Sequence, residues 1–150
     1  EPLDVCEILK QSTGEFSERI ADSSLALELQ LTDGPLTIMA DGRLLWRVFE
    51  NLLSNICKYS QPGTRVYVTT RVENGCVVTD FKNISRERLS IPGKDLAERF
   101  VRGDSSRSTE GSGLGLSIAK SFTELQGGTF DIITDGDLFK AALVFPQKTV

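Results

Sequence analysis

Three polar residues at helical spacing are the first candidates in this sequence for binding a metal ion or a phosphate. Asn51, Asn55 and Lys58 occupy positions i, i+4 and i+7 of a segment with a wide apolar stripe, so on a helix they share one line at the border of its apolar face. An Asn carbonyl oxygen is a neutral hard ligand that can complete a Mg²⁺ shell with waters and phosphate oxygens. A lysine ammonium is a point charge for phosphate. The line therefore suggests a site for Mg²⁺ and phosphate.

The same three residues also have a structural explanation. Buried polar groups cost free energy unless they are partnered. Neighbouring backbone groups can satisfy Asn51 and Asn55, and Lys58 can extend its ammonium to solvent along an apolar stem. The line alone supports both explanations equally, and a second element is needed to separate them.

A glycine-rich turn before a helix is that second element. Gly111, Gly113 and Gly115 alternate with small or apolar residues, the sequence is helical from Leu114 onward, and Gly127-Gly128 is typical of a helix C-terminus. Such a turn exposes backbone N–H groups at the positive end of a helix dipole, where phosphates bind. Alone it is a weak signal, because such turns often serve only close packing.

Composition limits the class of protein. The 150 residues are sufficient for a single domain, 1–150, with 39% hydrophobic and 25% charged residues, as in soluble globular domains. The net charge of −4 gives no basic field for nucleic acid. No apolar run is long enough to span a bilayer, and the chain begins without Met, so we expect a piece of a longer protein.

Histidine and cysteine usage exclude several chemistries. There is no histidine, which removes Ser-His-Asp catalysis, histidine metal sites and a histidine phosphoacceptor from this chain. The three cysteines, Cys6, Cys57 and Cys76, lack metal-ligand spacing and fit a reducing compartment as small apolar fillers.

The order of elements predicts the fold. We expect a helix over Asp4–Ile20, then a strand over Leu25–Leu31 that turns at Asp33-Gly34 into a return strand over Leu36–Met39. Asp41 caps the next helix, which runs to Tyr59. The remaining elements are a hairpin of Thr64–Glu73 and Cys76–Asn83 turned at Asn74-Gly75, a helical turn over Lys94–Phe100, a lid over Val101–Ser112, the helix after the glycine turn, and strands over Thr129–Thr134 and Leu138–Phe145. This order predicts an α+β two-layer sandwich, with a mixed, mostly antiparallel sheet and about three helices on one face.

Three segments together resemble the sequence boxes of bacterial sensor histidine kinases. Asn51–Tyr59 resembles the asparagine box, Glu98–Gly103 the phenylalanine box and Gly111–Leu116 the second glycine box, in the same order and at usual spacing. The whole chain resembles the catalytic, ATP-binding domain of such a kinase, and Glu1–Val5 resembles the exit from the dimerisation helices. The resemblance implies the Bergerat-type ATP-binding fold shared with gyrase-like ATPases.

The resemblance also implies roles for residues, with ATP and Mg²⁺ as the bound species. It implies Asn55 as the Mg²⁺ ligand, Asn51 beside the metal and phosphates, and Lys58 on the phosphates, and these three are the predicted catalytic residues. It implies Tyr59 near adenine, and Arg102 or Arg107 on the terminal phosphates. Close approach of the backbone to the triphosphate is expected at Gly111, Gly113, Leu114 and Gly115.

One box departs from the family pattern. The first glycine box normally reads Asp-x-Gly-x-Gly, and its Asp accepts a hydrogen bond from the adenine amino group. Here the stretch Lys82–Arg86 contains no glycine, and Asn83 stands where that Asp is expected. Its carbonyl can still accept the bond. Asp80 is the alternative acceptor, although it precedes the turn and can equally be a strand-edge charge.

The implied activity is phosphoryl transfer from Mg-ATP to a histidine on a separate dimerisation domain, followed in the parent protein by transfer to a response regulator. We expect a cytoplasmic domain that is monomeric as a fragment, from a homodimeric parent anchored in the bacterial plasma membrane. Two alternatives stay open. The missing first-box glycines suit a docking module with weak or no ATP binding, and an anti-sigma-type serine kinase uses the same fold.

Overall fold

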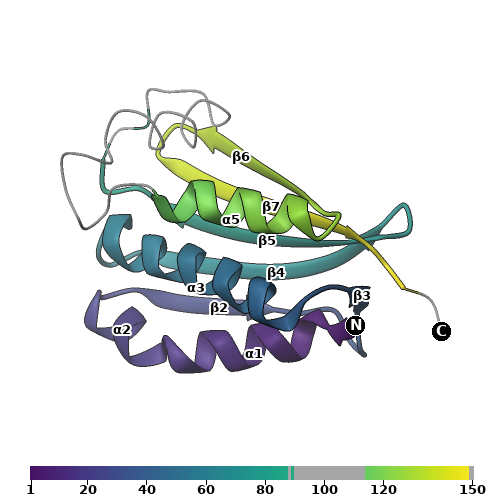
Figure 1. Ribbon diagram of the computed structural model, residues 1–150. Helices are drawn as coiled ribbons and strands as arrows, with labels where there is room; N and C mark the ends of the chain where they lie inside the picture. Colours follow the sequence, from purple (N-terminus) through teal and green to yellow (C-terminus); the bar gives the residue numbers. More distant parts are fainter. Residues whose placement is uncertain (88, 90–113, 149–150) are drawn as a thin grey trace.

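The computed structural model describes residues 1–87, 89 and 114–148, and within them the chain forms two layers. Helices cover one face of a mixed sheet (Figure 1). This arrangement confirms the predicted α+β sandwich, with four helices among the described residues where about three were expected. The helical turn over Lys94–Phe100 and the lid over Val101–Ser112 lie outside the described residues.

Within the described residues, the main sheet has five strands in the order β2-β4-β5-β7-β6. Among these described strands, only the β2–β4 pair is parallel. Asn74 and Gly75 have φ values of 52° and 76°, which the two-residue turn between β4 and β5 requires because both central residues must be left-handed. The strands are β2 (Ala26–Gln30), β4 (Arg65–Glu73), β5 (Cys76–Ile84), β6 (Thr129–Asp135) and β7 (Leu138–Pro146).

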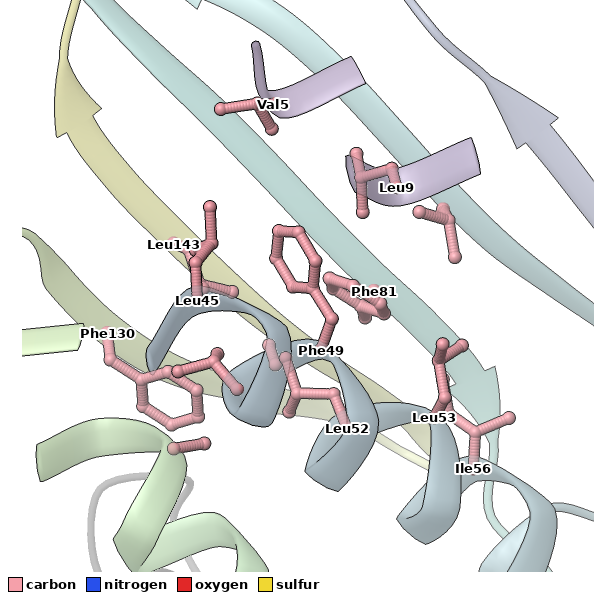
Figure 2. Close-up of a cluster of buried hydrophobic side chains, with 14 of the residues drawn as sticks. Val5, Leu9, Leu45, Phe49, Leu52, Leu53, Ile56, Phe81, Phe130 and Leu143 are labelled. Carbon is pink, nitrogen blue, oxygen red and sulfur yellow. The ribbon is translucent and has the colours of Figure 1, made fainter. Parts of the chain in front are cut away.

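Helix α3 (Gly42–Tyr59) is the centre of the core. The Asp41 carboxylate accepts hydrogen bonds from the Arg43 and Leu44 N–H groups, as predicted for the cap of this helix. Phe49 from α3 is 1% exposed and its ring centroid lies 5.6 Å from that of Phe81 on β5. Figure 2 shows this pair at the middle of an apolar cluster drawn from α1, α3 and the sheet. The apolar stripe of α3 therefore fixes which of its faces is left for polar residues.

The predicted first helix is two helices, which corrects the sequence prediction. Helix α1 (Val5–Glu15) is followed by its C-cap residue Phe16, and α2 (Ser17–Asp22) begins directly after it. The hydroxyls of Ser12 and Thr13 both donate to the Leu9 carbonyl. Side-chain hydroxyls that bond to preceding carbonyls compete with the helical ladder, and Gly14 weakens it further.

The predicted hairpin after the first helix was wrong. Strand β3 (Thr37–Met39) pairs with β1 (Pro2–Asp4), which was not predicted, and the two form a small separate sheet. The Asp4 carboxylate holds this pairing because it accepts hydrogen bonds from the N–H groups of Cys6 and Leu36.

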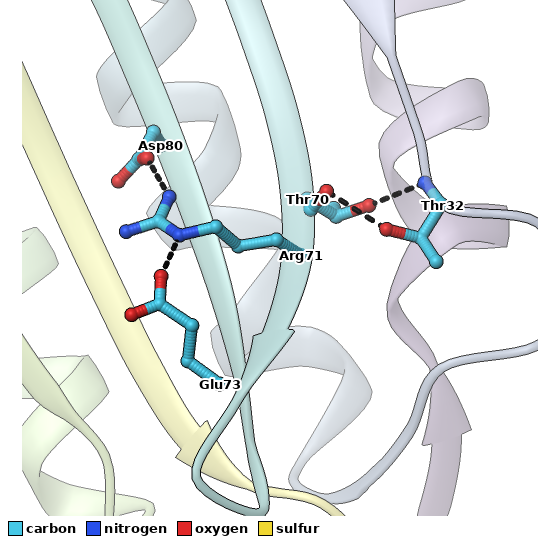
Figure 3. Close-up of polar contacts among 5 residues, drawn as sticks. All are labelled: Thr32, Thr70, Arg71, Glu73 and Asp80. Carbon is cyan, nitrogen blue, oxygen red and sulfur yellow. Dashed lines mark hydrogen bonds and ion pairs between the residues drawn. The ribbon is translucent and has the colours of Figure 1, made fainter.

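Strand β2 instead pairs with β4, and two threonines close the end of that pair. The Thr32 N–H donates to the Thr70 hydroxyl at 2.9 Å, and the Thr32 hydroxyl donates to the Thr70 carbonyl at 2.8 Å (Figure 3). Alternating leucines predicted a strand, but they carry no information on which strand will be its partner.

The last helix, α5 (Leu114–Leu125), lies beside α3 on the same face of the sheet (Figure 1). Its C-terminal end is followed by Gly127 at φ 88°, the left-handed conformation expected of a helix cap. Among the described helices, none combines the length and the apolar character needed to cross a lipid bilayer.

Gly128→Ala is expected to destabilise the domain by about 1–3 kcal/mol, because overpacking a filled core forces side chains to shift. A Cβ at Gly128 would lie 2.7 Å from a ring carbon of Phe145, which is 4% exposed and cannot move aside freely. Urea unfolding followed by circular dichroism measures the change.

Gly14→Ala is the matched control for this substitution. A Cβ at Gly14 meets nothing within 4 Å, and the residue lies inside α1, so Ala there should stabilise the domain by about 0.5–1 kcal/mol. Equal effects of the two substitutions would contradict the packing that the structure gives Gly128.

Candidate functional site

Two asparagine amides on α3 are buried without a partner. Asn51 and Asn55 lie one helical turn apart, and the Nδ2 atoms of both are inaccessible to solvent and have no hydrogen-bond partner among the described residues. The structural explanation, in which neighbouring backbone satisfies these amides, thus finds no support in that part of the chain. Leaving a buried donor unsatisfied costs about 1–3 kcal/mol, so the two amides indicate a position built for a ligand.

The start of α5 lies directly against this pair. A Cβ added to Gly115 would stand 3.5 Å from Asn55 Nδ2 and 3.6 Å from Asn51 Cβ. The first N–H groups of an α-helix have no partner within the helix, and here they lie near two unpartnered carboxamides. Leu114 is the first residue of α5, whereas Gly111 and Gly113 lie outside the described residues.

The C-terminal end of α3 carries the other two predicted residues. Tyr59 places its hydroxyl in the interior, where the atom has no partner within the described residues. Burial raises the pKa of this phenol, and the nearby Arg86 partly opposes that rise. Lys58 is half-buried, and its carbonyl accepts a hydrogen bond from Arg86 Nη2 at 2.5 Å.

Arg86 was not singled out from the sequence. Its guanidinium lies at the C-terminus of α3, where a cation complements the negative end of the helix dipole. Its backbone N–H also donates to the Tyr59 carbonyl at 2.8 Å. Two contacts from one residue thus tie the segment after β5 to the end of α3, and no periodic pattern in the sequence signals them.

Asn83 lies near the end of β5 and faces the α3 terminus. It is 4% exposed, and its Nδ2 donates to Ser60 Oγ at 2.8 Å. The Gln61 N–H donates to the Ile84 carbonyl at 2.8 Å, so backbone bonds hold the two segments together on either side of this contact. Ser60 is a second residue that the sequence did not indicate.

Asp80, the alternative acceptor, is engaged elsewhere. It stands three positions before Asn83 on β5, and side chains three apart on a strand point to opposite faces. Its carboxylate pairs with Arg71, which also pairs with Glu73 (Figure 3). These two carboxylates raise the pKa of the Arg71 guanidinium. Asn83 is therefore the acceptor candidate on the α3 side of the sheet.

Arg102 and Arg107, expected on the terminal phosphates, lie outside the described residues. The structure thus brings together Asn51, Asn55 and Gly115, and at the end of the same helix Tyr59 with Asn83 through Ser60.

The donor set fits a magnesium–phosphate site better than a site for a resident metal. Over residues 1–87, 89 and 114–148, no group of three His, Cys, Asp or Glu side chains lies close enough to hold a metal ion. Asn55 carries an amide oxygen, and the Nδ2 atom of the same amide has no partner among the described residues. Mg²⁺ is commonly held by one or two protein ligands plus substrate phosphates and waters, so one amide oxygen is compatible with Mg²⁺ that arrives with a nucleotide.

A surface hollow at the opposite end of α3 is a weaker candidate. It is lined by Met39, Asp41, Leu125 and Gln126 among others. The Asp41 carboxylate already caps α3, and the Gln126 side chain bonds to Asp41 N–H and to the Phe122 carbonyl. None of the buried unpartnered side-chain atoms among the described residues belongs to this hollow.

Comparison with known proteins agrees with the geometry. The family described as "Histidine kinase-, DNA gyrase B-, and HSP90-like ATPase" matches residues 40–147. The signal transduction histidine-protein kinase BaeS of Escherichia coli is 32% identical over 133 residues, which are 85% of this chain and 27% of that protein. The chain spans 24% to 33% of the length of four curated relatives.

Two solved structures have the same fold. The mycobacterial sensor histidine kinase MprB is 27% identical, with a TM-score of 0.79 over 100% of this chain and 99% of that one. The catalytic domain of histidine kinase ThkA is 20% identical, with a TM-score of 0.82 over 98% of this chain and 95% of that one.

Tyr59→Phe is expected to raise the free energy of unfolding by about 1 kcal/mol, because it removes a buried hydroxyl that lacks a partner among the described residues. Thermal unfolding without nucleotide measures this. Tyr67→Phe is the control, since Tyr67 lies beneath the Lys82 ammonium and is not among the buried unpartnered groups. Loss of stability on Tyr59→Phe would mean that the hydroxyl has a partner in the folded protein.

Proposed function

The chain belongs to the family of histidine kinase-, DNA gyrase B- and HSP90-like ATPases, and we propose that it binds Mg-ATP and provides the γ-phosphate to a histidine outside this chain. The observation that carries the proposal is the pair of buried amide nitrogens of Asn51 and Asn55, which have no partner among the described residues and lie against Gly115 at the start of α5. That arrangement leaves two amide groups that no described residue engages and that a ligand could engage.

In this proposal each predicted residue has a distinct task. Asn55 presents its amide oxygen to Mg²⁺, and the Asn51 amide meets the metal's waters and the phosphates. Lys58, with Arg102 or Arg107, balances phosphate charge. The backbone of the glycine turn approaches the triphosphate, at Gly111, Gly113, Leu114 and Gly115. Mg²⁺, when bound, would neutralise negative charge on the phosphate oxygens.

Catalysis by these residues is positioning and charge neutralisation. The bond between the γ-phosphorus and the β,γ-bridging oxygen breaks while a bond to a histidine nitrogen forms, and ADP leaves. The protein holds the donor in line with the acceptor, which lowers the entropic part of the barrier. The chain has no histidine, so the acceptor belongs to another segment or protein.

We propose that the parent protein is a two-component sensor kinase. In that role the domain works with a dimerisation domain that carries the phosphoacceptor, and the parent passes phosphate to a response regulator. The similarity to relatives such as the signal transduction histidine-protein kinase BaeS supports this role. The same inference gives a cytoplasmic domain, monomeric by itself, within a homodimeric parent anchored in the bacterial plasma membrane.

A docking module that barely binds ATP is the second candidate function. The observation that favours it is Asn83, which stands where the family has Asp, in a stretch without the first-box glycines. A module of this kind would keep the fold and lose the nucleotide.

Asn55→Ala is expected to abolish Mg²⁺-dependent binding of a non-hydrolysable ATP analogue, measured by calorimetry. The domain should stay folded, because the lost amide has no partner among the described residues. Ser54→Ala, one position earlier in α3, is the control and should bind as the unchanged chain does. Normal binding by Asn55→Ala would make Asn55 a structural residue.

Mixing the chain with a histidine-bearing dimerisation domain and γ-labelled ATP should label the histidine in that domain. Under the same conditions the chain alone should take up almost no label, since it has no acceptor histidine. The acid lability of the label identifies a phosphohistidine. ATP binding without any labelling of the partner would favour the docking module.

A further inference from the structure

We propose that the Arg86 guanidinium offsets the negative end of α3 and so strengthens the binding of phosphate by the last turn of that helix. The inference rests on the proposed function, because it takes a nucleotide triphosphate as the anion that meets this turn. It assigns to Arg86 an electrostatic role and no direct contact with the nucleotide.

Arg86 satisfies two of the carbonyl groups that α3 leaves open at its end. The last four carbonyls of an α-helix have no partner within the helix. In α3, the Lys58 carbonyl accepts from Arg86 Nη2, and the Tyr59 carbonyl accepts from the Arg86 backbone N–H at 2.8 Å. The guanidinium therefore lies on the helix end itself, where the partial negative charge of the helix dipole is concentrated.

That end of the helix is also where the phosphates are proposed to bind. Lys58, the proposed phosphate ligand, is in the last turn of α3, and Asn55, the proposed Mg²⁺ ligand, stands three positions before it. The carbonyls at a helix C-terminus repel an anion. Without a compensating cation, the helix that supplies these two side chains would therefore also oppose the phosphates.

A neutral side chain would be sufficient if the contact served only to end the helix. The chain contains such a case after α5, where Gln126 Nε2 donates to the Phe122 carbonyl at 2.8 Å. The proposed phosphate contacts of α5 are at its other end, at Leu114 and Gly115. The helix end near the proposed phosphates thus has a charged cap, and the helix end away from them has a neutral one.

The Tyr59 phenol reports the sign of the charge at this end of the site. Burial is the largest influence on the pKa of Tyr59 and raises it, whereas Arg86 comes next and lowers it, ahead of Glu87, which raises it. A cation lowers the pKa of a phenol because it favours the anionic form. Arg86 therefore outweighs its acidic neighbour here, and the field that favours a phenolate also favours a phosphate.

The test measures the affinity of the chain for adenosine, Mg-ADP and a non-hydrolysable Mg-ATP analogue. Calorimetry measures the two nucleotides, and displacement of the ATP analogue measures adenosine. Arg86→Gln removes the charge and keeps an N–H donor for the Lys58 carbonyl, as Gln126 does after α5. Affinity for the ATP analogue should fall about twofold to fivefold at low salt, which is the usual size of a charge–dipole effect. Affinity for Mg-ADP should fall less, and affinity for adenosine should not change.

Further measurements identify the charge as the cause. Arg86 is exposed, so the loss should shrink at about 0.5 M salt, where such charges are screened. Arg86→Lys keeps the charge and should keep most of the affinity. Arg43→Gln removes an equal charge at the other end of α3, roughly 20 Å away, and should bind as the unchanged chain does. Thermal unfolding without nucleotide tests that each variant is folded, and Arg86→Met is a second neutral variant if Arg86→Gln is not.

The outcomes separate this inference from the proposed function. An equal loss for adenosine and the ATP analogue, or no loss in the folded neutral variants of Arg86, would overturn the inference and leave the proposed function standing. A similar loss in Arg43→Gln would overturn it as well, because the effect would then come from the net charge. Failure of the unchanged chain to bind Mg-ATP would overturn both.

Discussion

Everything in this domain depends on α3 serving two purposes at once. One face of the helix supplies the centre of the core through residues such as Phe49, while its border carries Asn51 and Asn55 into the interior without partners among the described residues. Polar groups in that position oppose folding. The free energy gained by burying the apolar stripe must therefore exceed the cost of burying these polar groups. The packing of Phe49 on Phe81 is part of that stabilising contact between α3 and the sheet.

The same helix also organises the far end of the site. The segment after β5 is fastened to the α3 terminus by the backbone bonds of Gln61 and Arg86 and by the Asn83–Ser60 contact. The predicted phosphate end and the predicted base end are therefore parts of one rigid element. Their separation is set by the rise of an α-helix rather than by a loop.

Those parts of the fold and of the candidate site that depend on neighbouring residues in the sequence could be predicted. The α3 cap at Asp41, the Asn74-Gly75 turn and the line of Asn51, Asn55 and Lys58 all follow from spacing and residue type. Pairing between distant strands could not be predicted, because alternating leucines indicate a strand but not the strand with which it pairs. For this reason β3 was assigned to the wrong partner. Ser60 and Arg86 were missed for the same reason, since their partners lie more than 20 positions away.

The parallel pairing of β2 with β4 has a consequence for how the domain assembles. The connection between these strands contains α3, so the helix that carries the amides is the crossover of the only parallel pair in the main sheet of the described chain. The β4–β5 and β6–β7 hairpins close over short loops, whereas β2 must find its neighbour across the whole crossover, which is the slower event in folding. Strand β2 is also an edge strand whose side chains are mostly exposed. Local opening of the domain would therefore start at that edge and leave α3 in place, because Phe49 of α3 packs on Phe81 of the inner strand β5.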